Sequence, residues 1–299
     1  MALGVGTALP GCASIGPVRE EPKPAHFVLW QLPSQTSAQM NSYVMRTRGG
    51  KVIVIDGGNK GDAPYLEGFL AALGHHVHAW FISHPHPDHV DALTVILSEA
   101  EAGDPNPLAI DRIYGSMPPV SEVRKYETWS PVLVESVEQF NLALQRTGRR
   151  VEELQAGQLI VIDSVRFEIL GVRNPQITSN YLNNSSVAMR VSDARKSVLF
   201  TGDLGVQGGR KLLDGPFRDR LRADYVQMAH HGQRGVDEDF YVAVSPKYCL
   251  WPTPRWLWDN DKGEGKGSGD WDTLNVRAWM DRLGVRRHYV CADGLHRIE

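Results

Sequence analysis

Short runs of hydrophobic residues, bounded by Gly, Pro, Asn and Asp, recur along the chain and alternate with segments of helical periodicity. Apolar runs of about four to eight residues are typical of buried strands, whereas apolar residues three and four positions apart are typical of one helix face. The alternation predicts an α/β architecture. The expected strands are 26–32, 42–47, 51–55, 77–82, 159–162, 165–170, 186–191, 197–201, 225–228, 248–250 and 288–290, and the expected helices are 63–73, 88–98, 131–145, 237–244 and 271–283.

Two stretches break this pattern. Residues 103–131 are rich in proline and mixed in character, and we interpret them as a long surface insertion near a cleft. Residues 259–270, "DNDKGEGKGSGD", form a Gly-rich loop flanked by tryptophans. Neither stretch indicates a domain boundary, so a single domain from residue 25 to residue 299 is expected.

Polar residues that can bind metals follow four of the predicted strands. Asp56 ends "VIVID", a cluster of histidines and aspartate follows "AWFIS", Asp203 follows "VLFTG", and His230 and His231 follow "YVQMA". Such residues at the ends of separate buried strands can meet at one edge of a sheet. This arrangement therefore predicts a metal site there.

The cluster "SHPHPDH" has the spacing of a metal site. His84 and His86 lie two positions apart in an extended turn, so both rings can share an ion at Zn–N distances of about 2.0–2.1 Å. Asp88 and His89 point elsewhere and suit a second ion. The prolines between these residues restrict the turn before any ion binds. The alternative interpretation is a polar surface turn.

The motif set resembles that of the metallo-β-lactamase superfamily. "SHPHPDH" is similar to its His-x-His-x-Asp-His signature, and Asp56, Asp203 in "LFTGD" and the "HHG" of residues 230–232 follow in the family's order. The resemblance spans roughly residues 26–235. It implies an αββα sandwich, with two mixed β-sheets packed face to face and helices on the outer faces.

One departure from the family's pattern is informative. The superfamily usually supplies a third histidine to the first metal, but no histidine occurs from Val90 to Gly202. "NNSSVAMRV" from Asn183 to Val191 stands there instead, which resembles the hydrolase domain of bacterial DNA-uptake channel proteins and phosphorylcholine esterases. An amide oxygen binds zinc more weakly than imidazole, so the first ion is expected to be loosely held or to be manganese. Alternatively, the asparagines close a turn.

The resemblance also implies a role for each residue. The catalytic residues would be Asp88, His231 and Asp56, with His231 free to donate to the substrate and Asp56 orienting a ligand histidine. A water molecule between two divalent ions, zinc first and manganese second, would be the nucleophile, its pKa lowered to about 7. The ligands would be His84, His86 and Asp203 with Asn184 or Asn183 for the first ion, and Asp88, His89, Asp203 and His230 for the second.

The function that we expect is metal-dependent hydrolysis, and the "NNSS", "TGD" and "HHG" set favours phosphodiesters as substrates. A lactone or β-lactam hydrolase remains an alternative, although the missing histidine counts against a typical β-lactamase. A second alternative is a member of the fold that binds metal without catalysis. No Gly-x-Ser-x-Gly motif is present, which disfavours a serine hydrolase.

Other aromatic and histidine residues have two interpretations each. Trp251, Trp256 and Trp258 could stack on a substrate base, sugar or ammonium group, or could pack in the core. The histidines of "GHHVHAW", residues 74–80, are expected to have surface or core roles without metal.

Composition and charge limit the partners. Lys and Arg number 32 and Asp and Glu number 35, and a net charge of −3 favours no nucleic acid or anionic membrane. We therefore expect a small-molecule or phosphodiester substrate, no transmembrane segment and no particular oligomeric state. Residues 1–24 are either a flexible segment or the remnant of an export leader with a lipoprotein-like "LPGC" ending at Cys12. A leader would indicate an exported or lipid-anchored protein, and its absence a cytoplasmic one.

Overall fold

The computed structural model describes residue 1 and residues 27–299. The predicted leader segment and Cys12 lie outside the described residues. Among the described residues, no helix is long and apolar enough to cross a membrane.

The first sheet has seven strands, and it carries most of the N-terminal half. Its central strands are hydrophobic at nearly every position because both faces are covered: in β3, Ile53 and Ile55 face the second sheet, whereas Val52 and Val54 face helices. In spatial order the strands are β16 (His296–Ile298), β1 (Phe27–Gln31), β2 (Ser42–Thr47), β3 (Val52–Asp56), β5 (Ala79–Phe81), β7 (Ile113–Gly115) and β8 (Val151–Glu153).

The second sheet also has seven strands and comes from the C-terminal half. It is mixed, because β12 to β15 run parallel to one another while β9 to β12 are antiparallel. In spatial order the strands are β15 (Arg287–Val290), β14 (Tyr248–Trp251), β13 (Tyr225–Gln227), β12 (Ser197–Phe200), β11 (Ala188–Ser192), β10 (Val165–Gly171) and β9 (Leu159–Ile162). A separate pair consists of β4 (His76–Val77) and β6 (Ala109–Ile110).

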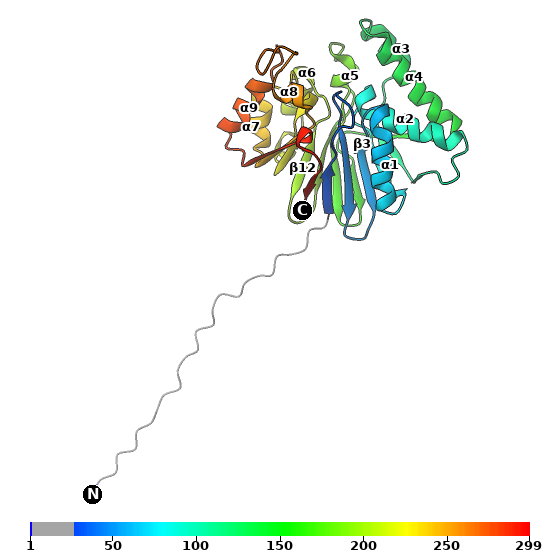
Figure 1. Cartoon of the computed structure of the whole chain (residues 1–299). Coiled ribbons are helices and arrows are strands. Elements are labelled where there is room, and N and C mark those ends of the chain that lie inside the picture. The colour runs from blue at the N-terminus through cyan, green and yellow to red at the C-terminus, as the bar shows by residue number, and fades with distance from the viewer. Residues whose placement is uncertain (2–26) are drawn as a thin grey trace.

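Helices cover the outer faces of both sheets (Figure 1). The first sheet is covered by α1 (Ala63–Ala72), α2 (Pro87–Glu101) and α4 (Pro131–Arg146), which α3 (Val120–Tyr126) adjoins. On the second sheet lie α6 (Val206–Leu213), α7 (Glu238–Val244) and α9 (Thr273–Arg282). The shorter helices are α5 (Tyr181–Asn184) and α8 (Arg255–Trp258), with 3-10 turns at Lys60–Asp62, Arg218–Arg220, Ala229–Gly232 and Cys291–Asp293.

The hydrophobic core has one layer between the sheets and one beneath each set of helices. Phe81 of the first sheet stacks on Phe167 of the second, with ring centroids 5.0 Å apart. Trp80, the next residue along, is buried on the opposite side beneath the helices. These layers confirm the predicted αββα sandwich.

The predicted elements are largely confirmed, with two errors. Residues 103–131 are not only a surface insertion, because they contain β6, β7 and α3. The buried strand β7 lies between β5 and β8 in the first sheet. Its three residues are too few to show a period among the surrounding prolines. The single strand expected at 77–82 is also divided, since β4 pairs with β6 and β5 with β3.

Candidate metal centre

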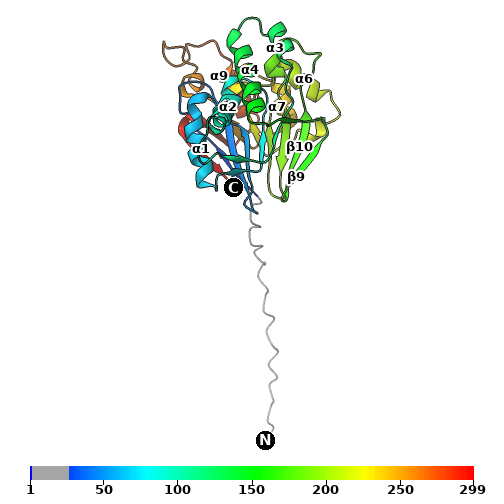
Figure 2. The same ribbon diagram turned by 90° about the vertical axis from the view of Figure 1, so that its right-hand side faces the viewer.

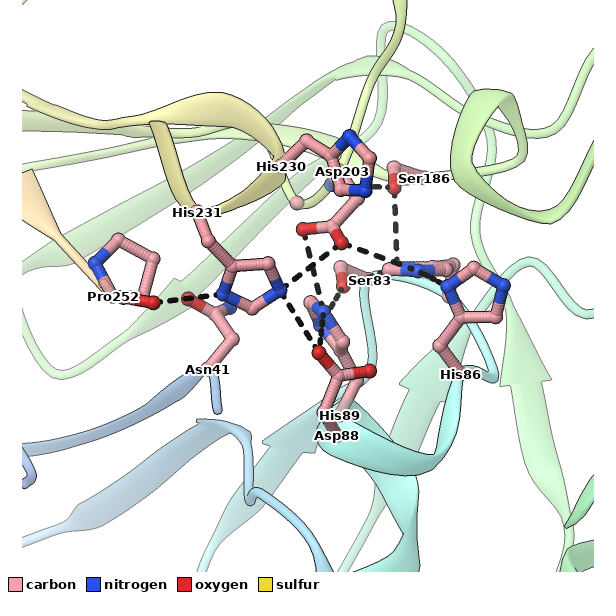
Figure 3. Close-up of polar contacts among 12 residues, drawn as sticks. Asn41, Ser83, His86, Asp88, His89, Ser186, Asp203, His230, His231 and Pro252 are labelled. Atoms are coloured by element: carbon pink, nitrogen blue, oxygen red, sulfur yellow. Dashed lines mark hydrogen bonds and ion pairs between the residues drawn. The ribbon is translucent and has the colours of Figure 1, made fainter. Parts of the chain in front are cut away.

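The four groups of predicted site residues meet at one edge of the sandwich. Asp56 ends β3, residues 84–89 follow the neighbouring parallel strand β5, Asp203 follows β12, and His230 and His231 follow the neighbouring parallel strand β13. The carboxyl ends of parallel strands lie at the same edge of a sheet. Figure 3 shows the side chains converging from both sheets.

One group of ligand-type atoms belongs to Asp88, His89, Asp203 and His231, whose atoms lie within 4.8 Å of one another. We call this group the second subsite, because most of its residues were predicted to bind the second ion. Nε2 of His231 lies 2.9 Å from Oδ2 of Asp88 and 3.3 Å from Oδ2 of Asp203, and Nε2 of His89 lies 3.3 Å from Oδ1 of Asp203. Ligands about 2.0–2.1 Å from a tetrahedral zinc ion would be roughly 3.3 Å apart. The spacing therefore fits a coordination shell.

The directions of these atoms also fit a cation. Nε2 of His89, Nε2 of His231 and Oδ1 of Asp203 are buried, and none has a hydrogen-bond partner among the described residues. A buried polar atom without a partner costs about 1–3 kcal/mol. Because the atoms are close but do not make hydrogen bonds to one another, a shared ion would satisfy them.

The other group, which we call the first subsite, is His84, His86 and Asp203. Nε2 of His84 lies 2.9 Å from Nδ1 of His86 and 3.9 Å from Oδ2 of Asp203. The opposite ring nitrogen of His84 contacts the hydroxyls of Ser83 and Ser186 at 3.1 and 3.2 Å. Since Asp203 belongs to both subsites, it is placed to bridge two ions.

Asp56 has the contacts that its predicted orienting role requires. Nδ1 of His89 donates to Oδ2 of Asp56 at 2.8 Å, so Nε2 is directed into the second subsite. The carboxylate also accepts hydrogen bonds from the amide of Asn41 at 2.6 Å and from the backbone N–H and hydroxyl of Ser83 at 2.7 and 2.8 Å. Four donors thus hold a carboxylate that is fully buried.

The two histidines of "HHG" have different environments. Nδ1 of His231 donates to the carbonyl of Pro252 at 2.8 Å, which leaves Nε2 available in the second subsite. Nδ1 of His230 donates to the carbonyl of Arg234 at 3.1 Å, and its Nε2 lies 3.4 Å from the amide nitrogen of Asn183. The sequence-based assignment made His230 the ligand, but the structure places His231 among the candidate ligands.

The two asparagines differ in the same way. Oδ1 of Asn184 accepts hydrogen bonds from the backbone N–H groups of Gly205 and Gly208, each at 3.0 Å. Oδ1 of Asn183 is buried and has no hydrogen-bond partner among the described residues, while its nitrogen donates to Asn180 at 2.9 Å. Asn184 therefore joins α5 to α6, and only Asn183 has an uncommitted amide oxygen.

The backbone at the site has unusual dihedral angles. Asp56, His230 and His231 have φ values of 56°, 50° and 56°, in the left-handed region that side chains with a Cβ rarely adopt. Such residues cost of order 1–3 kcal/mol each and persist where the surrounding structure holds them. Three of them at one edge of the sandwich support a functional role for this edge.

The tryptophans lie behind the site or beside it. Trp251 is fully buried; its Nε1 donates to Nδ1 of His288 at 2.9 Å, and its ring packs edge-on against Trp258. Its burial excludes contact with a substrate in this conformation and agrees with the core-packing alternative. Trp256 contacts Trp271 and borders a hollow of about 530 Å³. A substrate role for Trp256 and Trp258 stays a prediction.

Burial and charge separate the histidines into two classes. Burial lowers the pKa of His86 to about 4 and, with help from neighbouring histidines, lowers the pKa of His84 well below its usual value. Burial would also lower the pKa of His231 and His89, but nearby carboxylates, Asp203 foremost, outweigh it. They raise the pKa of His231 to about 10 and that of His89 well above its usual value.

A further cluster of His76, His78 and Asp111 lies near the surface. Nε2 of His76 donates to Asp111 at 2.7 Å, and Nδ1 of His78 accepts the backbone N–H of Val52 at 3.2 Å. These contacts are complete without an ion, and we assign no site there.

Sequence reasoning missed several supporting residues. Ser83 and Ser186 contact His84, and Ser83 also contacts Asp56. Both serines adjoin motif residues, and that adjacency was their only signal. Asn41 and Pro252 support the site from distant segments, and no local pattern identified them.

The comparisons with known proteins concern the family and the fold. The metallo-beta-lactamase superfamily profile matches residues 37–228. The fold is similar to the metallo-beta-lactamase fold protein YhfI from Bacillus subtilis, with a TM-score of 0.53, 14% identity and coverage of 91% of this chain and 99% of that chain. It is also similar to CmlA, a diiron beta-hydroxylase from Streptomyces venezuelae, with a TM-score of 0.52, 15% identity and coverage of 93% of this chain but 55% of that chain. No curated protein sequence matches significantly. The chain belongs to the metallo-beta-lactamase superfamily.

Proposed function

We propose that the protein is a metal-dependent hydrolase with two divalent ions and that its substrates are phosphodiesters. The observation that carries this proposal is the convergence of two groups of candidate ligands that share Asp203, with buried, unpaired ligand atoms in the second subsite. Membership of the superfamily supports a metallo-hydrolase in general. The choice of phosphodiesters as the substrate class goes beyond what membership of the superfamily supports.

The proposed ligands follow the geometry of each subsite. His231 replaces His230 as the histidine of the second subsite, because its Nε2 lies among the other ligand atoms. Asn183 is favoured over Asn184 as the additional ligand of the first subsite, because its oxygen is uncommitted. The full sets are His84, His86, Asp203 and Asn183 for one ion, and Asp88, His89, Asp203 and His231 for the other.

The residues around the ions have distinct tasks. Two ions at this site would lower the pKa of bound water and stabilise the charge that develops at phosphorus. Asp56 and the carbonyl of Pro252 fix the tautomers of His89 and His231. His230 lies close enough to His86 to affect the pKa of His86, and when protonated at Nε2 it would donate to the leaving oxygen.

Phosphodiesters rank first for two reasons. The "NNSS", "TGD" and "HHG" set resembles the DNA-uptake hydrolase and phosphorylcholine esterase subgroup. The amide nitrogen of Asn183, a donor that lies 3.4 Å from Nε2 of His230, is also near the first subsite, where it suits a non-bridging phosphoryl oxygen. Zinc is the first candidate metal and manganese the second, and iron joins the test because CmlA is described as a diiron protein.

The decisive experiment combines metal analysis with a substrate panel. Purified protein reconstituted with zinc, manganese or iron is assayed on bis(p-nitrophenyl) phosphate, nitrocefin and a homoserine lactone. We expect two ions per chain and the highest kcat/KM on the phosphodiester. Faster turnover of nitrocefin or the lactone would replace phosphodiesters with a carbonyl substrate, and a folded protein that binds no metal would exclude hydrolysis.

The adjacent histidines provide a matched pair of variants. His231→Gln should lose about one equivalent of metal and nearly all hydrolysis. His230→Gln should keep both equivalents and lower kcat by about 10²-fold or more, the range typical of a lost proton donor. The opposite pattern of metal loss would restore His230 as the ligand.

A further inference from the structure

A cavity of about 500 Å³ lies beside the second sheet, and Asn184 of α5 is among its lining residues. It is bounded by the end of β10, the segment that follows β10 and α6; Figure 2 labels β10 and α6. Its volume is in the range of small-molecule sites, about 300–1,000 Å³. The apolar lining is mainly aliphatic and includes Leu170, Ile177, Leu204, Leu212 and Phe217.

The charges of this lining have one sign. Lys211 and Arg173 line the cavity, and no Asp or Glu is among the lining residues. Lys211 is exposed and has no ion pair among the residues described. Arg173 forms an ion pair with Glu122 at 3.1 Å, but its Nε is buried and has no hydrogen-bond partner among the described residues. The cavity therefore combines apolar walls with uncompensated donors.

The wall nearest the metal centre is held in place. Asn184 lines the cavity and is anchored by the N–H groups of Gly205 and Gly208. Ser186 lines it as well, and its hydroxyl accepts the N–H of Asp203 at 2.9 Å. Because both side chains are committed to protein partners, the cavity is formed before a ligand arrives, which reduces the ordering cost of binding.

We propose that this cavity binds an anionic amphiphile, a molecule with one alkyl group and one phosphate or carboxylate. The alkyl group would lie against the aliphatic wall of Leu170 and Leu212, and the anion would bind Lys211 at the mouth. Burial of the alkyl group supplies affinity, and the ammonium group selects a charged head over a neutral one. This site is separate from the proposed hydrolysis and needs neither bound metal nor turnover.

Calorimetric titration of the metal-loaded protein tests the proposal with octyl phosphate, octanol and inorganic phosphate. We expect one octyl phosphate per chain outside the metal centre, bound at least about tenfold more tightly than either fragment. Lys211→Ala should weaken the binding of octyl phosphate about tenfold and leave the binding of octanol unchanged. Lys211→Arg should restore the binding of octyl phosphate. Lys51→Ala, which changes an exposed lysine without an ion pair among the described residues, is the matched control.

Two further variants locate the ligand. Ile177→Trp, at the partly exposed rim, should fill the cavity and abolish binding of the alkyl group. Asp203→Asn and chelated wild-type protein should retain octyl phosphate binding, because the phosphate is not expected to need the ions. The proposal would be overturned if wild type and Lys211→Ala bound octyl phosphate equally well, or if Ile177→Trp still bound it. Loss of octyl phosphate binding in both metal-deficient samples would also overturn it.

Discussion

At the residue scale, the protonation of His231 links the metal centre to pH. In the folded protein without metal the pKa of His231 is raised to about 10, because the charges of Asp203 and Asp88 outweigh the effect of burial. In the unfolded chain it is about 6.5. A group whose pKa is higher in the folded state than in the unfolded state stabilises the fold, and this stabilisation is fully present below the pKa of the unfolded state. It is lost as the pH rises through the pKa of the folded state.

The resulting prediction concerns the metal-free protein. Its free energy of unfolding in urea should fall by on the order of 1–3 kcal/mol between pH 7 and pH 10. His231→Gln should show a smaller fall, since glutamine does not titrate and only the raised pKa of His89 still contributes. The metal-loaded protein should lack the fall, because a metal ligand is already deprotonated. If the free energy of unfolding of the metal-free wild type did not change between pH 7 and pH 10, His231 would be neutral in the folded protein over this range.

Asp56 gives a second prediction at this scale. Asp56→Asn replaces an acceptor of four hydrogen bonds with a group that can accept on one atom only, so the ring of His89 loses its fixed orientation. We expect a 10–100-fold loss of metal affinity, measured by competition with a chromogenic chelator. Asp281→Asn, on the exposed surface, is the control. Unchanged affinity would mean that Ser83 alone orients His89.

At the element scale, the turn after β13 determines which histidine enters the second subsite. His230 and His231 both have left-handed φ values, and Gly232 continues the turn with φ of +78°. A Cβ at Gly232 would lie 2.3 Å from the ring of Trp251. The buried tryptophan therefore packs directly behind the turn that carries the candidate ligand His231.

Two glycines with similar backbone angles test the importance of this packing. Gly232→Ala and Gly284→Ala both place a Cβ at a positive φ, of +78° and +72°, but only the first meets a neighbour. Both should lose about 1 kcal/mol from the backbone, and Gly232→Ala should lose about 1–3 kcal/mol more through overpacking, together with activity. Equal losses in thermal unfolding would show that Trp251 moves aside without cost.

At the scale of the whole molecule, the proposed metal centre has candidate ligands from both sheets. The first sheet contributes residues 84–89 and Asp56, and the second contributes Asp203 and His231. Ions bound to both sheets should stabilise the sandwich, because a ligand that binds only the folded state adds about 4 kcal/mol at a thousand times its Kd.

Chelation should therefore lower the Tm of the purified protein by about 8–16 °C, since 1 kcal/mol corresponds to about 2–4 °C for a chain of roughly this size. The Tm of Asp203→Asn should respond much less to the chelator, because that variant lacks the shared ligand. If the chelator left the Tm of the wild-type protein unchanged, metal would not join the sheets.

Much of the fold was predictable from local patterns, and the exceptions have specific causes. The strands β2 and β3 are hydrophobic enough on both faces to be recognised, whereas β7 has three residues and gains its place only from β5 and β8 on either side. His76 and His78 were expected to have roles without metal, but their contacts with Asp111 and Val52 were not predicted. Local periodicity cannot report such long-range partners.

The sequence by itself predicted the sandwich architecture and most of the candidate ligands of the proposed metal centre, because strand periodicity and a seven-residue motif are local properties. It could not distinguish His230 from His231 or Asn183 from Asn184, since neighbours in the chain share the same local pattern. The tertiary structure decided both cases. The left-handed turn directs His231 between Asp88 and Asp203, and the N–H groups of α6 occupy the oxygen of Asn184. The direction of a side chain depends on backbone angles and on partners from distant segments, and only the folded chain brings these together.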